Sequence, residues 1–146
     1  MTTASSQASK RIVVGIDGSA PSVGAATWAM RQAELTGSTI HAVTTWHSPN
    51  TFGYPMPIPE GFDLAAEATK VIDGAVGQLR AEHPAVEIRT AVEEGHAAQV
   101  LVEASKGADL LVVGSRGHGE FAGMLLGSVS EHCVAHAHCP VLVFRH

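Results

Sequence analysis

A glycine-rich segment holds the residues of this sequence with the clearest chemistry. Gly114 and Gly117 follow an apolar run, and Gly127-Ser128 opens a helical pattern after nine further residues. A strand that ends in glycines exposes backbone N–H groups, and the start of the next helix adds unpaired N–H groups and the positive end of the helix dipole. These groups attract negative charge, so we expect this loop to hold phosphate.

The loop differs from two well-known nucleotide loops. It lacks the lysine and the spacing of G-x-x-x-x-G-K-[ST], and Gly15 and Gly18 near the first apolar run do not complete G-x-G-x-x-G. Without that lysine or a positioned base, the sequence does not predict fast hydrolysis of a nucleoside triphosphate. The alternative, that the glycines only make a tight connection, stays open, because glycine often serves turns alone.

Strand-like and helix-like segments alternate along the chain. The predicted helices are 20–35, a segment from Asp63 to before Pro84, a short helix after Gly95 in which Val100 and Leu101 face inward, and 128–136. The predicted strands, short and rich in β-branched residues, are 12–16, 39–45, 86–92, 109–114 and 140–144.

This alternation predicts an α/β fold with one five-stranded parallel sheet, strand order 3-2-1-4-5, and helices on both faces. In such a sheet, ligands bind beyond the carboxyl ends of the first and fourth strands, where the winding reverses. The turn at 15–19 and the loop after Gly114 are therefore expected to meet at one crevice. Trp46, at the end of the second strand, is placed to border it.

The segment 47–62 contains four prolines and two glycines, which predicts a long surface loop without regular structure. We expect this loop to act as a lid over the crevice.

Length, charge and cysteine content narrow the class of protein. The chain of 146 residues predicts one domain at 10–146 after a flexible tail at 1–9. A net charge of -5 argues against nucleic acid or a membrane surface as the main partner. The polar start and the strand-sized apolar runs indicate neither a signal peptide nor a membrane span, so a cytoplasmic location is expected. Cys133 and Cys139 are expected to be free thiols.

Three segments together resemble one known family. They are G-S-R-G-H-G at 114–119 with its spacing to Gly127-Ser128, V-V-G-I-D-G-S at 13–19, and C-P-V-L-V at 139–143. From Lys10 to its end, the chain is similar in these features to the universal stress proteins. The pattern G-x2-G-x9-G-[ST], which marks the ATP-binding branch of that family, is matched without a gap.

The resemblance implies an adenine nucleotide alpha hydrolase-like fold and a set of binding residues. Asp17 and the backbone of Val43 would hold the adenine and ribose, and the loop and the helix that follows it would hold the phosphates. The phosphate candidates are Gly114, Gly117, Gly127 and Ser128, with Arg116, Val129 and Ser130 as further candidates and His118 as a position that varies in the family.

Two of these residues also have purely structural interpretations. Asp17 has the alternative role of a turn or N-cap residue for the first helix, where its carboxylate would accept backbone N–H bonds, although its place at the strand end favours the ligand role. Ser128 is expected to cap its helix whether or not phosphate is bound.

The resemblance also implies ATP with Mg2+ as ligands and a homodimer that pairs through the last strand, Val141 to Phe144. We therefore expect a nucleotide-responsive regulatory or stress-survival protein that is not an enzyme. The alternatives are a binder of cyclic AMP or another adenine nucleotide, or a slow ATPase. An adenylating enzyme of related fold would need S-G-G-x-D-S after its first strand, which the sequence lacks.

A dense group of histidines and cysteines lies near the end of the chain. His132 and His136 share a helix face, which is compatible with a metal ion, but Cys133 points about 100° away from His132 and no C-x2-C pair is present. We therefore interpret Cys133 as a small core residue and Cys139 as a buried residue at the start of the last strand. His138 completes the group.

Overall fold

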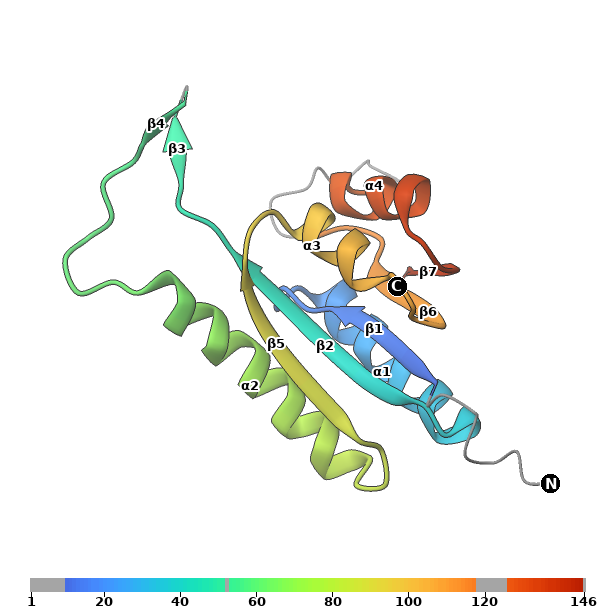
Figure 1. Ribbon diagram of the computed structural model, residues 1–146. Helices are drawn as coiled ribbons and strands as arrows, with labels where there is room; N and C mark the ends of the chain where they lie inside the picture. Colours follow the sequence, from blue (N-terminus) through green and yellow to red (C-terminus); the bar gives the residue numbers. More distant parts are fainter. Residues whose placement is uncertain (1–9, 52, 118–125, 146) are drawn as a thin grey trace.

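A five-stranded parallel sheet with the order β5-β2-β1-β6-β7 forms the centre of the protein (Figure 1). The computed structural model describes residues 10–51, 53–117 and 126–145. The strands of the sheet are β1 (Arg11–Gly15), β2 (Thr39–Trp46), β5 (Ile88–Glu94), β6 (Leu110–Gly114) and β7 (Val141–Phe144). This order is the one predicted from the alternation of strands and helices.

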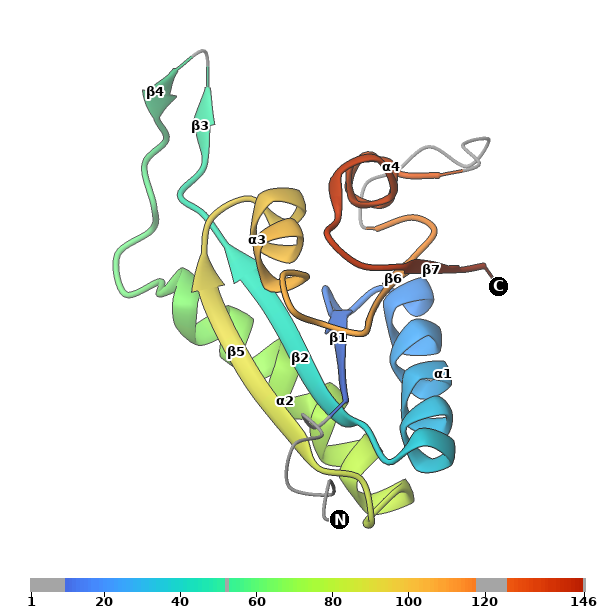
Figure 2. The same ribbon diagram turned by 45° about the vertical axis from the view of Figure 1, so that its right-hand side comes forward.

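Helices cover both faces of the sheet, as Figure 2 shows. On one face, α1 (Ala20–Thr36) and α2 (Leu64–Glu82) enclose the larger core, which contains Met30, Ile72 and Val112. On the other face, α3 (Ala97–Ala104) and α4 (Ser128–His136) enclose a smaller core around Leu101 and Cys133. Successive side chains of a strand point to opposite faces, so each central strand contributes to both cores.

The ends of α1 follow the sequence signals. Ser19 is the N-cap, and its side-chain oxygen accepts the Ser22 N–H at 3.4 Å. Pro21 lies in the first turn, where its missing N–H costs no helix bond. Gly37 ends the helix with φ +72°, a left-handed conformation that favours glycine. The direction in which α1 leaves the end of β1 is therefore fixed locally.

Strand β5 begins two residues later than the predicted third strand. The prediction began at Val86, but the Val86 N–H donates to the His83 carbonyl at 3.1 Å in the turn that follows α2. Ladder pairing starts at Ile88, opposite Ile40, and continues to Glu94, opposite Trp46. The alternating pattern correctly indicated an edge strand, because β5 lies at the end of the sheet.

The absence of regular structure predicted for 47–62 is wrong. Strands β3 (Asn50–Thr51) and β4 (Tyr54–Pro55) pair antiparallel, and Gly53, with φ +82°, lies between them. Proline is tolerated there because β4 is an edge strand with no further neighbour to bond. Figures 1 and 2 both show this hairpin projecting from the body of the molecule, and residues 53–62 are exposed and do not line the crevice described below. The structure therefore does not support a lid.

Residue His41 on β2 makes the stability of the fold depend on pH. Its pKa is lowered, first by burial and then by the nearby charges of Arg11 and Arg89, while Glu87 acts in the opposite direction. The folded state therefore favours the neutral imidazole. This contribution is fully present above the unfolded pKa of about 6.5 and is lost as the pH falls through the lower folded pKa.

We predict that His41→Gln makes stability less sensitive to acid. Glutamine cannot be protonated in this range, so the free energy of unfolding should fall less between about pH 7 and about pH 5 than it does in the wild type. Urea unfolding at the two pH values measures this difference. His138→Gln, at an exposed position, is the control for the loss of a histidine elsewhere in the chain. An equally steep fall in His41→Gln would contradict the assignment.

Candidate functional site

A cavity of about 320 Å3 opens at the carboxyl ends of the central strands. Its floor comes from Ile16 after β1, Thr44 and Thr45 on β2, and Val113 at the end of β6. Strand β1 lies between β2 and β6, so the cavity occupies the point where the winding of the sheet reverses. The turn at 15–19 and the loop after Gly114 meet here, as the sequence predicted.

Every predicted binding residue within the described part of the chain borders this cavity, except Ser128. Ser128 borders a second pocket directly beside it. His118 lies outside the described residues. The structure therefore brings together, from three separate segments, the residues that the sequence selected.

Asp17 joins the two loops that form the cavity mouth. Its Oδ1 accepts hydrogen bonds from the Ser19 backbone N–H at 2.8 Å and from the Ser19 hydroxyl at 2.5 Å. The turn role expected for Asp17 is therefore present, while Ser19 rather than Asp17 is the N-cap. The other carboxylate oxygen faces Gly117, because a Cβ atom added to Gly117 would lie 2.7 Å from it. One side chain thus serves both the turn and the cavity wall.

Gly114 has a structural reason to be glycine. A Cβ atom there would lie 2.8 Å from the Pro21 carbonyl carbon and 2.8 Å from the Pro21 Cβ. The first turn of α1 therefore packs directly on the end of β6, and no side chain fits between them. This close approach also places the N-terminal end of α1 at the cavity.

Ser130 ties together the two ends of the glycine-rich loop. Its hydroxyl is buried and donates to the Ser115 carbonyl at 2.8 Å or to the Gly127 carbonyl at 3.0 Å. The Gly127 N–H also donates to the Ser115 carbonyl, at 2.6 Å. Ser130 therefore holds the loop closed through its hydroxyl.

The expectation that Ser128 caps α4 is wrong. Gly127 is the N-cap, with extended dihedral angles of φ -81° and ψ 172°, and Ser128 is the first helical residue. Glycine has no side chain, so the N-terminus of α4 has no side-chain cap. Ser128 is exposed at the rim between the cavity and the second pocket.

The backbone of Val43 takes part in the sheet. Its carbonyl accepts the Ile16 N–H at 2.8 Å, which connects the middle of β2 to the segment after β1. A carbonyl has a second lone pair, so contact with a ligand is still available, but the Val43 side chain is 5 % exposed and belongs to the smaller core.

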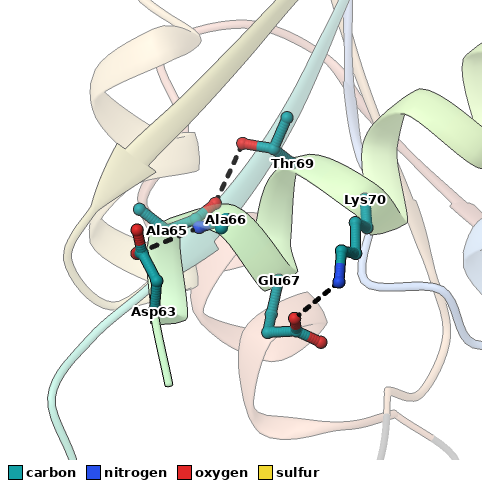
Figure 3. A network of polar contacts seen from close by, with 6 residues as sticks. All are labelled: Asp63, Ala65, Ala66, Glu67, Thr69 and Lys70. Atoms are coloured by element: carbon teal, nitrogen blue, oxygen red, sulfur yellow. Dashed lines mark hydrogen bonds and ion pairs between the residues drawn. The ribbon is translucent and has the colours of Figure 1, made fainter. Parts of the chain in front are cut away.

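Helix α2 supplies a cavity wall that the sequence analysis missed. Leu64, Glu67, Ala68 and Val71 all border the cavity. The Asp63 carboxylate caps this helix by accepting the Ala66 N–H at 3.1 Å, and Glu67 pairs with Lys70 at 3.1 Å (Figure 3). The periodicity of α2 indicated an apolar face, but only the packing shows that its first two turns border the cavity. The expectation that Trp46 borders the crevice is confirmed.

The residues near the end of the chain separate into two environments. Cys133 is completely buried in the smaller core, and burial raises its pKa to about 11, so this thiol is inert at neutral pH. His132 and His136 are both exposed on α4, and the centroids of their imidazole rings lie 4.5 Å apart. Cys139 is half-buried, not buried as expected. In the part of the chain that the structure describes, no three His, Cys, Asp or Glu side chains are grouped to hold a metal ion.

Known proteins resemble this chain over nearly its whole length. The sequence model of the universal stress protein family matches residues 8–145. This chain belongs to the universal stress protein family. Universal stress protein Rv2623 of Mycobacterium tuberculosis is 37 % identical over 157 aligned positions, which cover 97 % of this chain and 49 % of that protein. The chain therefore spans about half the length of the curated relatives it matches.

Solved structures of family members have the same fold. A universal stress protein crystallised in complex with cAMP is 28 % identical, with a TM-score of 0.71, and covers 95 % of this chain and 98 % of its own. A universal stress protein family protein from Arabidopsis thaliana with AMP bound is 22 % identical, with a TM-score of 0.65, and covers 94 % of this chain and 91 % of its own. The family member described here has the adenine nucleotide alpha hydrolase-like fold.

None of the described helices has both the length and the apolar character that crossing a membrane requires.

Proposed function

We propose that the chain binds an adenine nucleotide in the cavity at the carboxyl ends of β1, β2 and β6. The observation that carries this proposal is that Asp17, from the turn after β1, and Gly117 and Gly127, from the glycine-rich loop, converge on one cavity. Its volume of about 320 Å3 is at the lower end of the range for small-molecule sites. A relative 28 % identical to this chain is described as a complex with cAMP, which supports an adenine nucleotide as the ligand class.

ATP is the nucleotide that we propose first. The glycine-rich loop follows β6 and leads to the N-terminus of α4, where the positive end of the helix dipole attracts a chain of phosphates. Cyclic AMP is the second candidate, because it is the ligand of the relative just named and carries only one phosphate. Arg116 is the only lysine or arginine among the described residues that border the cavity.

The donor set of the cavity is compatible with Mg2+ accompanying the phosphates. Mg2+ is usually bound by one or two carboxylates together with substrate phosphates and water. Asp17 and Glu67 are the carboxylates that border the cavity. We propose that these residues, with the nucleotide, supply the oxygen ligands.

We also propose that the protein hydrolyses its bound nucleotide little or not at all. The described lining contains no lysine to stabilise charge on a transferred phosphate. Such a site retains its nucleotide unchanged. A protein of this kind works as a cytoplasmic regulatory or stress-survival module that responds to nucleotide occupancy.

We further propose that two copies pair through β7. This strand is at the edge of the sheet, and its Val141 and Val143 pack on one core while Leu142 and Phe144 pack on the other. All four side chains are only half-buried, so a second copy would cover apolar surface and use the open edge. Sedimentation velocity tests this directly, and a monomer at high protein concentration would contradict it.

A competition titration tests the nucleotide proposal. A fluorescent adenine nucleotide is displaced by ATP, ADP, AMP and cyclic AMP, with GTP as the base control. We expect displacement by the adenine nucleotides, ATP being the strongest, and no displacement by GTP at the same concentrations. Equal displacement by GTP, or none by any nucleotide, would overturn the proposal. A preference for cyclic AMP would favour the second candidate.

A further inference from the structure

A second pocket, of about 560 Å3, lies directly beside the nucleotide cavity. The two share a wall made by Thr45, Trp46, Leu64, Ala97 and Val129. Three imidazoles, those of His47, His96 and His132, border the second pocket but not the first. We call this second pocket, with its three histidines and Ser128, the histidine pocket.

Backbone pairing brings His47 and His96 together. Trp46 on β2 is opposite Glu94 on β5, and the Gly95 N–H donates to the Trp46 carbonyl at 2.8 Å. His47 follows Trp46 in the chain, and His96 follows Gly95. The centroids of their rings lie 4.4 Å apart, and the ring planes are tilted by 40°. Two imidazoles so close repel each other when both are protonated, and an anion bound against them relieves this repulsion.

The third imidazole comes from α4. Ser128 and His132 are four residues apart, so they lie on one face of the helix, and both border the histidine pocket. Ser128 belongs to the predicted phosphate loop. The histidine pocket therefore begins at the phosphate end of the nucleotide site.

The lining of the histidine pocket is compatible with an anion, although most charged groups on the surrounding elements are acidic. Among the described residues that border it there is no carboxylate, so protonated imidazoles have no acidic competitor in the lining. Charged groups lie on the surrounding elements instead. They are Glu93 and Glu94 at the end of β5, Glu131 on α4, and Asp17, Glu67 and Arg116 in the neighbouring cavity.

We propose that the histidine pocket receives the distal phosphates of the nucleotide, so that His47, His96 and His132 make the protein select nucleoside triphosphates over monophosphates, more strongly at acidic pH. This inference rests on the proposed function. Histidine is the side chain whose charge changes between about pH 5 and about pH 8, so protonated imidazoles add donors and positive charge as the pH falls. AMP lacks the distal phosphates, so its affinity serves as the internal reference.

The test compares ATP and AMP affinities by calorimetry at about pH 6 and about pH 8. The variants are the triple substitution His47→Gln, His96→Gln, His132→Gln and the single substitution His132→Gln, with His138→Gln as the control outside the pocket. Glutamine keeps a polar side chain of similar size without the charge. All three pocket histidines are exposed, so the variants should fold as the wild type does. Comparing proteins at one pH cancels the titration of the nucleotide itself.

We expect the wild-type ratio of ATP to AMP affinity to exceed that of the triple variant by about tenfold at pH 6, as for charge-assisted contacts, and by less at pH 8. The single variant should lie between them, and the control should match the wild type. An unchanged ratio in the triple variant, with AMP still bound, would overturn this inference and leave the proposed function standing. Absence of AMP and ATP binding in the wild type would overturn both.

Discussion

The Gly114→Ala protein is expected to lose about 1 to 3 kcal/mol of its free energy of unfolding, the usual cost of inserting a methyl group into a closely packed region. The added methyl would lie 2.8 Å from the carbonyl carbon of Pro21, which is backbone and cannot turn away. Either α1 must shift from the end of β6 or the strand must bend. Urea unfolding of the wild type and the variant measures the difference.

Gly77→Ala is the matched control for this change. Gly77 lies on the exposed side of α2, and a Cβ atom there has no neighbour within 4 Å. Alanine favours the helix over glycine, so we expect this variant to gain about 0.5 to 1 kcal/mol. If both variants changed stability equally and in the same direction, the close packing of Gly114 on α1 would not be the cause.

Gly117→Ala is expected to separate binding from folding. Its added methyl would lie 2.7 Å from the Asp17 Oδ2, the far end of a side chain, so a small rotation of the carboxylate relieves the contact. Stability should therefore change by less than about 1 kcal/mol, as for most sites with room to adjust. The methyl and the displaced carboxylate would both occupy the cavity where the nucleotide is proposed to bind.

We predict that ATP affinity of Gly117→Ala falls about a hundredfold, the scale of losing one or two charge-assisted hydrogen bonds. Calorimetric titration measures the affinity, and circular dichroism confirms the fold. Gly77→Ala, far from the cavity lining, should bind as the wild type does. Wild-type affinity in Gly117→Ala would show that the ligand does not approach this backbone.

Local signals explain why so much of the fold could be predicted from the sequence. Short β-branched runs, the cap at Ser19 and the glycine at Gly37 act within a few residues, so each strand and helix is determined nearby. Alternation of strands and helices then leaves few arrangements of a parallel sheet. The hairpin around Gly53 was missed because prolines and glycines indicate only irregular chain, although they are also compatible with a short edge ladder.

The candidate site was predictable only in part, because a motif identifies residues but not their partners. The sequence selected Gly114 as a phosphate-loop residue, yet its contact with Pro21 joins segments about ninety positions apart. Ser130 was likewise selected only as a further phosphate candidate, and the structure adds that its hydroxyl closes the loop by bonding the Ser115 carbonyl. The approach of His47 to His96 depends on the register of β2 and β5, which no local pattern gives.

The central claim is that an adenine nucleotide binds where the loop after β6 meets the turn after β1. Amide chemical shifts during a titration of the 15N-labelled protein with ATP test this claim most directly. We predict that the largest shifts belong to Gly114, Gly117, Gly127 and Ser128, followed by Asp17, with amides at the opposite end of the sheet unchanged. Shifts concentrated elsewhere, for example along β5 or the outer face of α1, or no shifts at saturating nucleotide, would contradict the account.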